Sequence, residues 1–317
     1  MAFGRTVCRV GSSFVNGPGA GADALRDLTA RAGRASHDLI GWMMWDPGAK
    51  AAYAELGVAA PQTWILAWRL APLGAVSPAV AAAVTYSIRP EVLEAVLAVV
   101  GAATTPDDVL RVRDDAVLPG LALVSDTLAD ELGFLSDDLW RGIDSVHGGG
   151  RPMFSAHRAR GERGPSGSGL SSWLALNCIR EYRGDNHWAL CASAGLNDVE
   201  VGLLHSVLVD PVEYGGEEWI ARSRGADDAA IADGWERLTA KGLADGSTVN
   251  AEGRRFRHEL ERRTDELTSP IWQEVGLTTT ERFCELVEPW HDAFVARIDA
   301  TAGPRWMPAV RTTARPA

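Results

Sequence analysis

The sequence predicts a mainly α-helical protein, and three observations support this fold class. Helix-start signals recur along the chain, with Ser, Thr, Asp or Pro standing just before a segment of helical apolar periodicity. Runs of β-branched residues that alternate with period two are almost absent. At 317 residues and 46% hydrophobic content, the chain is also long and apolar enough to fold around a sizeable core.

The front of the chain consists of helices punctuated by proline and glycine. Residues 1–21 are rich in Gly and Ser, so we expect a flexible N-terminus. Helical patterning begins at Ala22 and ends at Asp46, where Pro-Gly follows. One long helical stretch is expected from Thr105 to Gly133. Further helix starts are expected at Pro61, Ser77-Pro78, Pro90 and Ser136.

The C-terminal part has the order of a winged helix. Asp227 and Asp228 begin a helix that ends at Lys241-Gly242-Leu243, a small β-wing is expected around Asp245-Gly246, and Asn250 caps the next helix. We therefore expect a helical domain with the candidate site over 22–215 and a winged-helix-like module over 216–300. A flexible tail is expected over 301–317.

Charge argues against nucleic acid as a partner. In a winged helix, the helix before the wing enters the major groove. Here Asp227, Asp228, Asp233 and Glu236 oppose only Arg237 and Lys241 on that helix. The whole chain has a net charge of −11, a field that repels phosphate backbones. The module is therefore expected to serve packing or contact with a partner.

The four cysteines show no CxxC or other metal spacing, and they are typical of reduced, buried thiols in a cytoplasmic protein. No run of 18 apolar residues and no signal-peptide pattern appears. We therefore expect a cytoplasmic protein with no membrane partner. GxSxG, SxxK, HExxH and strand-linked GxGxxG motifs are also absent, which points to chemistry by positioning and proton transfer, without metal or cofactor.

The stretch "REYRGDNHWAL", residues 180–190, concentrates opposite charges where a helix is expected to begin. The sequence predicts a break at Gly184, with Asp185 as the N-cap of a new helix and His187 in its first turn. A cap of this kind is a common structural arrangement. The alternative is a small-molecule site in which Asp185 and His187 are catalytic and Arg183 binds substrate.

Further candidate residues lie outside this block. Arg69 stands in a very apolar helix, so it must reach solvent or find a partner such as Asp46, Asp185 or a ligand anion. Asp46 is therefore included as a third catalytic candidate, although turn initiation before Pro47 also explains it. The remaining substrate-binding candidates are Trp188, Glu200 and His205.

Glu200 and His205 lie about 140° apart around one helix, and this does not suit a two-ligand metal site.

Several segments together resemble a large family of actinobacterial proteins with an "REhRGDgH" core, here Arg180 to His187. The other matching pieces are "WRLAPLG" (68–74), "GRPMFSA" (150–156) and a C-terminal "E..TD" within 235–265. The resemblance covers most of the chain and implies a C-terminal helix-turn-helix region. In general profile, without a motif match, the chain is also similar to helical enzymes that close aziridine rings.

Two functional hypotheses follow. The first is a cofactor-free biosynthetic enzyme that cyclises a small anionic, amino-acid-like metabolite with loss of sulfate or phosphate. Arg69 and Arg183 would bind the anion, and Asp185 or Asp46 with His187 would take the proton. A partner subunit or a homodimer remains open as the means of completing the site. The second hypothesis is a ligand-responsive regulator or scaffold of the winged-helix type.

Overall fold

The computed structural model describes residues 20–60, 63–160 and 163–311. The first ten helices are α1 (Ala20–Gly41), α2 (Pro47–Glu55), α3 (Thr63–Leu70), α4 (Pro78–Thr85), α5 (Pro90–Ala103), α6 (Pro106–Ala122), α7 (Leu128–Gly133), α8 (Ser136–Ser145), α9 (Pro152–Ala159) and α10 (Gly169–Ser193). The remaining elements are α11 (Asp198–His205), α12 (Pro211–Tyr214), α13 (Trp219–Ser223), α14 (Asp228–Ala240), β1 (Ala244–Asp245), β2 (Thr248–Val249), α15 (Ala251–Val275), α16 (Leu277–Val287) and α17 (His291–Ala302). Short 3-10 helices are η1 (Trp42–Trp45), η2 (Ala71–Leu73), η3 (Ser206–Leu208), η4 (Glu288–Trp290) and η5 (Pro308–Val310).

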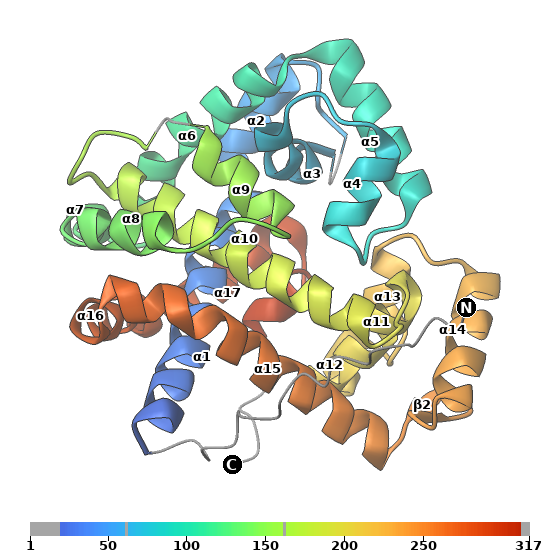
Figure 1. The fold of residues 1–317 in the computed structure, drawn as a ribbon. Helices are drawn as coiled ribbons and strands as arrows, with labels where there is room; N and C mark the ends of the chain where they lie inside the picture. Colours follow the sequence, from blue (N-terminus) through green and yellow to red (C-terminus); the bar gives the residue numbers. More distant parts are fainter. Residues whose placement is uncertain (1–19, 61–62, 161–162, 312–317) are drawn as a thin grey trace, which may run out of the picture.

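Helix α10 is the central element of the main body (Figure 1). It packs against α1, α7, α8, α9 and α15, and most of its side chains are buried. The surrounding core contains large side chains from both ends of the chain, among them Trp42, Trp173 and Trp272. Because most of α10 is buried, the polar residues on its buried faces must find partners inside the protein.

The winged-helix-like module has a core of its own, built from α11, α13, α14, the wing and the first turns of α15. The wing is a two-stranded antiparallel hairpin in which Ala244 pairs with Val249 and Asp245 pairs with Thr248. Gly246 takes the positive φ (62°) that the tight turn requires. Leu238, Leu243 and Val249 bury the wing against α14, so the hairpin belongs to the folded module.

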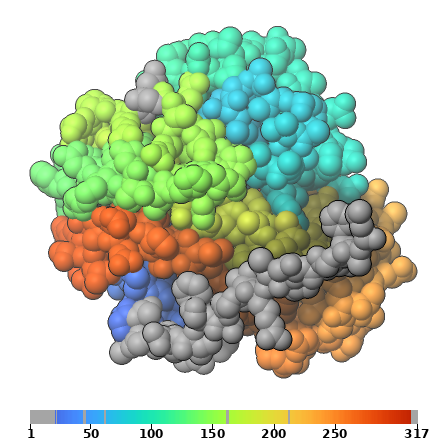
Figure 2. Space-filling view, viewed as in Figure 1, coloured from blue at the N-terminus to red at the C-terminus, as the bar shows by residue number. Residues whose placement is uncertain are grey.

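The module meets the main body along the loop between α4 and α5. The Arg89 N–H donates to the carbonyl of Arg224, which follows α13, at 3.0 Å. A side chain added at Gly225 would come within 2.5 Å of Val92, so the two segments are in close contact. In the space-filling view, the light orange module occupies one corner of the molecule beside the cyan helices α4 and α5 (Figure 2).

The structure confirms the expected mainly α-helical fold with a small β-wing. Ser77 and Asn250 each accept a backbone N–H as predicted helix caps, and Thr105 and Asp227 do the same where helices were expected to begin. The helix start expected at Pro61 lies outside the described residues, as does the segment 1–19 of the expected flexible N-terminus.

Two predicted elements were wrong in detail. The stretch from Thr105 to Gly133 forms two helices, α6 and α7, because the chain turns between Ala122 and Leu128. Helix α8 begins at Ser136 as expected, but the side chain of Ser136 is not its N-cap: the hydroxyl accepts the Gly167 N–H at 3.0 Å and so fixes the loop before α10.

Among the described residues, no single helix is long and apolar enough to cross a membrane. The segments Thr63–Leu73 and Pro78–Thr85 together have the length and composition of a membrane span, but the chain bends by 97° between them.

Candidate functional site

The charged block of the sequence lies inside one uninterrupted helix. The break expected at Gly184 was wrong, because α10 runs from Gly169 to Ser193. A glycine within a helix costs about 1 kcal/mol relative to alanine, and the packing of α10 against its neighbouring helices outweighs that cost. The N-cap prediction for Asp185 was therefore also wrong. Asp185 caps a different helix: the Phe154 N–H in the first turn of α9 donates to Asp185 Oδ2 at 2.9 Å.

Arg69 reaches a carboxylate that the sequence reasoning did not select. Arg69 Nε and Nη2 donate to the two carboxylate oxygens of Glu181, each at 3.0 Å, and Arg180 Nη2 donates to Glu181 Oε1 at 2.5 Å. Burial alone would raise the pKa of Glu181, but the charges of Arg180 and Arg69 outweigh it and lower that pKa. Arg69 thus pairs with Glu181, and neither Asp46 nor Asp185 makes an ion pair with it.

Arg183 is paired with α15. Arg183 Nη2 donates to Glu261 Oε2 at 2.5 Å and to Asp265 Oδ1 at 3.2 Å. Arg257 Nη1 lies 2.6 Å from Glu261 Oε1. The "E..TD" segment of α15 therefore faces the "REYRGD" segment of α10, which joins two motifs that lie about 80 residues apart in the sequence.

His187 is held in its neutral form. The Thr264 hydroxyl donates to the Leu260 carbonyl at 2.7 Å, so His187 Nδ1, 3.0 Å from that hydroxyl, is the donor of their hydrogen bond. His187 Nε2 is then an acceptor, and it lies 3.7 Å from Cys191 Sγ. Burial lowers the pKa of His187 to about 3, and the nearby arginines Arg257 and Arg183 act in the same direction.

Asp185 differs from its neighbours in its pKa. Burial raises its pKa to about 6, although the backbone N–H groups of Phe154 and Met153 oppose the shift. The charges of Asp185 and Arg69 interact, which places them in the same region of the interior. A carboxyl group with this pKa exchanges a proton near neutral pH more readily than His187 does.

The remaining sequence candidates lie elsewhere. Asp46 accepts the Ala49 N–H at 2.7 Å as the N-cap of α2, and it lines a separate surface pocket of about 500 Å³. Glu200 forms a capping box with Asn197 at the start of α11 and also pairs with Lys241 and Arg237. Trp188 stacks on Tyr86 with ring centroids 5.6 Å apart.

Sequence reasoning did not identify Arg224, which follows α13 in the module. Its guanidinium has no hydrogen-bond or ion-pair partner among the described residues, and its Nη1 is buried. Burial and the charges of Arg69 and Arg257 lower the pKa of Arg224 to about 10. "ARSRG" carries no sequence signal for this position, because Arg224 reaches Arg69 and Arg257 only through the docking of the module on α10.

Together these side chains form a central ion network, defined here as Arg69, Arg180, Glu181, Arg183, Asp185, Arg224, Arg257, Glu261 and Asp265. The network brings the predicted residues Arg69, Arg183 and Asp185 together, with His187 and His205 beside it. Asp46 and Glu200 lie outside it. No group of three or more His, Cys, Asp or Glu side chains in the described part of the chain is arranged to hold a metal ion.

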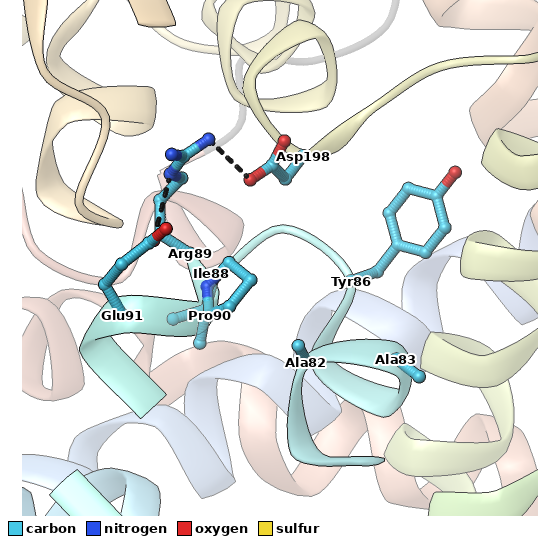
Figure 3. A pocket seen from close by; sticks show the side chains of 8 residues that line it. All are labelled: Ala82, Ala83, Tyr86, Ile88, Arg89, Pro90, Glu91 and Asp198. Carbon is cyan, nitrogen blue, oxygen red and sulfur yellow. Dashed lines mark hydrogen bonds and ion pairs between the residues drawn. The ribbon is translucent and has the colours of Figure 1, made fainter. Parts of the chain in front are cut away.

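A surface pocket of about 440 Å³ lies beside the junction between module and body, lined by Tyr86, Arg89, Glu91 and Asp198 (Figure 3). Arg89 lies 3.4 Å from Glu91 and 3.5 Å from Asp198, so its charge is already balanced. This pocket therefore does not offer an unpaired cation, in contrast to Arg224.

Helix α14, which would enter the major groove in a DNA-binding winged helix, presents acidic residues to solvent, including Asp228, Asp233 and Glu236. Its two cations, Arg237 and Lys241, both pair with the fully buried Glu200.

The fold defines the class of protein: a helical body joined to a winged-helix-like module, with a buried ion network where the two meet. A family model described as a helix-turn-helix family matches residues 29–301, and the chain belongs to that family. No curated protein and no solved structure matches the chain.

Proposed function

We propose that the chain binds a small anionic metabolite at the central ion network and acts on it there. The charge balance of that network carries the proposal. Its five arginines face four carboxyl groups, and the pKa of one of these, Asp185, is raised to about 6. A buried site with surplus positive charge is stabilised when an anion is bound within it.

The reaction we propose is an intramolecular cyclisation that releases an oxyanion. An amine of the substrate attacks its own carbon, the C–N bond forms, and the C–O bond breaks with its electron pair leaving on sulfate or phosphate. Asp185 takes the amine proton, because its pKa of about 6 makes it a better base than His187, whose pKa is about 3. The neighbouring arginines stabilise the charge on the leaving group.

The test uses O-sulfo-L-serine and O-phospho-L-serine as probes, with L-serine as the matched neutral compound. We expect the two esters to raise the melting temperature of the protein, and NMR to show release of sulfate or phosphate. Asp185→Asn should still bind the esters but release no oxyanion. Equal effects of the esters and of serine contradict the binding proposal. Full turnover by folded Asp185→Asn contradicts the assignment of the base.

A ligand-responsive regulator or scaffold is the second candidate, favoured by the helix-turn-helix family and by the wing on α14. The pairing of Arg237 and Lys241 with Glu200 argues against DNA contact by that helix. A gel shift at low salt with DNA from upstream of the gene separates the two candidates. Sequence-specific binding would favour the regulator. No binding at micromolar concentrations of the protein would favour the metabolite site.

A further inference from the structure

We propose that a phosphate or sulfate group of the ligand binds at the corner of the network formed by Arg69, His205, Arg224 and Arg257, called the Arg224 corner below. Arg224 is the cation that the module contributes. The inference rests on the proposed function and deepens it: it names the side chains that bind the anion, and it identifies the anionic group as a tetrahedral dianion.

The first argument is the absence of internal charge compensation at Arg224. Arg69 has Glu181 and Arg257 has Glu261, but Arg224 has no carboxylate partner among the residues that the structure describes. Arginine stays protonated at neutral pH, so a guanidinium whose Nη1 is buried without a partner is costly unless an anion binds to it. The two nearest charges, on Arg69 and Arg257, are positive and increase that cost.

The second argument is the type of group left without a partner. Buried nitrogen atoms with no hydrogen-bond partner in the described chain include Arg224 Nη1 and His205 Nε2. The arginine nitrogen can only donate, so the ligand that satisfies it is an acceptor. His205 lies within reach of the charges of Arg257 and Arg224, which places its ring at the same corner.

The third argument is geometry. The three arginines come from different elements: Arg69 from α3, Arg257 from α15 and Arg224 from the end of α13. The Glu181 pair uses Arg69 Nε and Nη2, so Nη1 of Arg69 takes no part in that pair. The charges of Arg69 and Arg257 both act on Arg224, so guanidinium donors from three elements lie near one another. Three separate donor groups suit the oxygens of a tetrahedral anion, whereas a carboxylate presents two oxygens in one plane.

The corner is also reachable from outside. The side chain of Arg69 is 16% exposed, and Arg224 and His205 are only partly buried. Because the backbone of Arg224 is held against the main body by the Arg89 N–H, an anion bound there would join the module to the body. Ligand binding should therefore stabilise the whole chain.

The test compares wild type with Arg224→Gln and Arg224→Lys, and with Arg222→Gln as a matched control. Arg222 lies two residues away, is exposed, and already pairs with Glu218 and Asp228. The probes are sodium sulfate and sodium phosphate, measured by calorimetric titration and thermal shift against sodium chloride and sodium malonate at equal ionic strength.

We expect sulfate and phosphate to bind wild type and Arg222→Gln alike. Arg224→Gln should bind them at least about tenfold more weakly, because it loses a charged hydrogen-bond donor. Arg224→Lys should lie between the two, because it keeps the charge without the planar fork. In chloride alone, Arg224→Gln should melt no lower than wild type, since an uncompensated charge has been removed.

Equal sulfate affinity in Arg224→Gln and Arg222→Gln overturns the proposal, and so does malonate binding as strong as sulfate binding. A lower melting temperature of Arg224→Gln in chloride, with unchanged sulfate affinity, would give Arg224 a structural role only. Sulfate binding that requires Arg224, without any effect of the serine esters, supports the corner and contradicts the proposed substrate class. The two proposals therefore fail separately.

Discussion

Glu181→Gln tests the central ion network most severely by its effect on stability. Glu181 is 1% exposed and accepts hydrogen bonds from Arg69 and Arg180, two arginines whose side chains are 16% and 7% exposed. Removing one partner of a buried ion pair typically costs about 3–5 kcal/mol, because the remaining charge stays buried. Glutamine retains the shape and some hydrogen bonding, so we expect a loss of about 3 kcal/mol.

The assay is urea unfolding followed by tryptophan fluorescence, with Glu259→Gln as the control. Glu259 pairs with Arg262 on the surface of α15 and is 48% exposed, so its replacement should change the free energy of unfolding by less than about 1 kcal/mol. A loss below about 1 kcal/mol in Glu181→Gln would refute the view that this pair is a stabilising part of the buried interior.

The pH dependence of the same variant gives a second readout. The pKa of Glu181 is lower in the folded chain than in the unfolded chain. Its stabilisation is therefore fully present above about pH 4.5 and is lost as the pH falls below that value. Glu181→Gln should lose less stability on acidification than wild type does. Parallel curves for the two proteins would contradict this.

Further predictions concern the packing, the histidine and the wing. Gly253→Ala should lower the free energy of unfolding by about 2 kcal/mol, because its Cβ would come within 2.1 Å of the Leu243 carbonyl oxygen. Gly101→Ala, at an open helical position, should raise it by up to about 1 kcal/mol. Equal melting temperatures of the two variants would contradict this. His187 has a pKa of about 3 when folded, so between about pH 6.5 and pH 3 only the unfolded chain takes up a proton there, and the folded state loses stability as the pH is lowered. Between pH 7 and pH 5, His187→Asn should therefore lose about 2 kcal/mol less stability than wild type, as measured by denaturant unfolding. Glu200→Gln should destabilise the chain by about 2 kcal/mol, because Lys241 and Arg237 lose their carboxylate partner; an unchanged melting curve would show that this buried pairing is not stabilising.

The helical fold and the wing were predictable because their signals are local. Caps such as Asp227 and Asn250, and the turn at Asp245-Gly246, act on residues only a few positions away. The continuity of α10 was not predictable, because Gly184 is a local breaker whose effect is overridden by packing against helices distant in the sequence.

The candidate site was predictable only in part, for the same reason. The density of charge in residues 180–187 drew attention to this segment, and the structure places Arg69, Arg183 and Asp185 in the central ion network. The partners of these residues depend on tertiary contacts. Glu181 was counted only as one charge of the block and not as the partner of Arg69, and Arg224 approaches α10 only because the module docks there. Because Arg183 is paired with Glu261 and Asp265, the proposed anion site keeps Arg69 but replaces Arg183 with Arg224 and Arg257.

The central claim is that an anion binds at the Arg224 corner. Crystals of the protein soaked in selenate, a tetrahedral dianion with an anomalous signal, test this claim directly. The account predicts an anomalous peak within hydrogen-bonding distance of the guanidinium groups of Arg224 and Arg257, and no peak at that place in crystals of Arg224→Gln. Peaks confined to exposed surface arginines such as Arg222, or a peak at the corner that persists in Arg224→Gln, would contradict it.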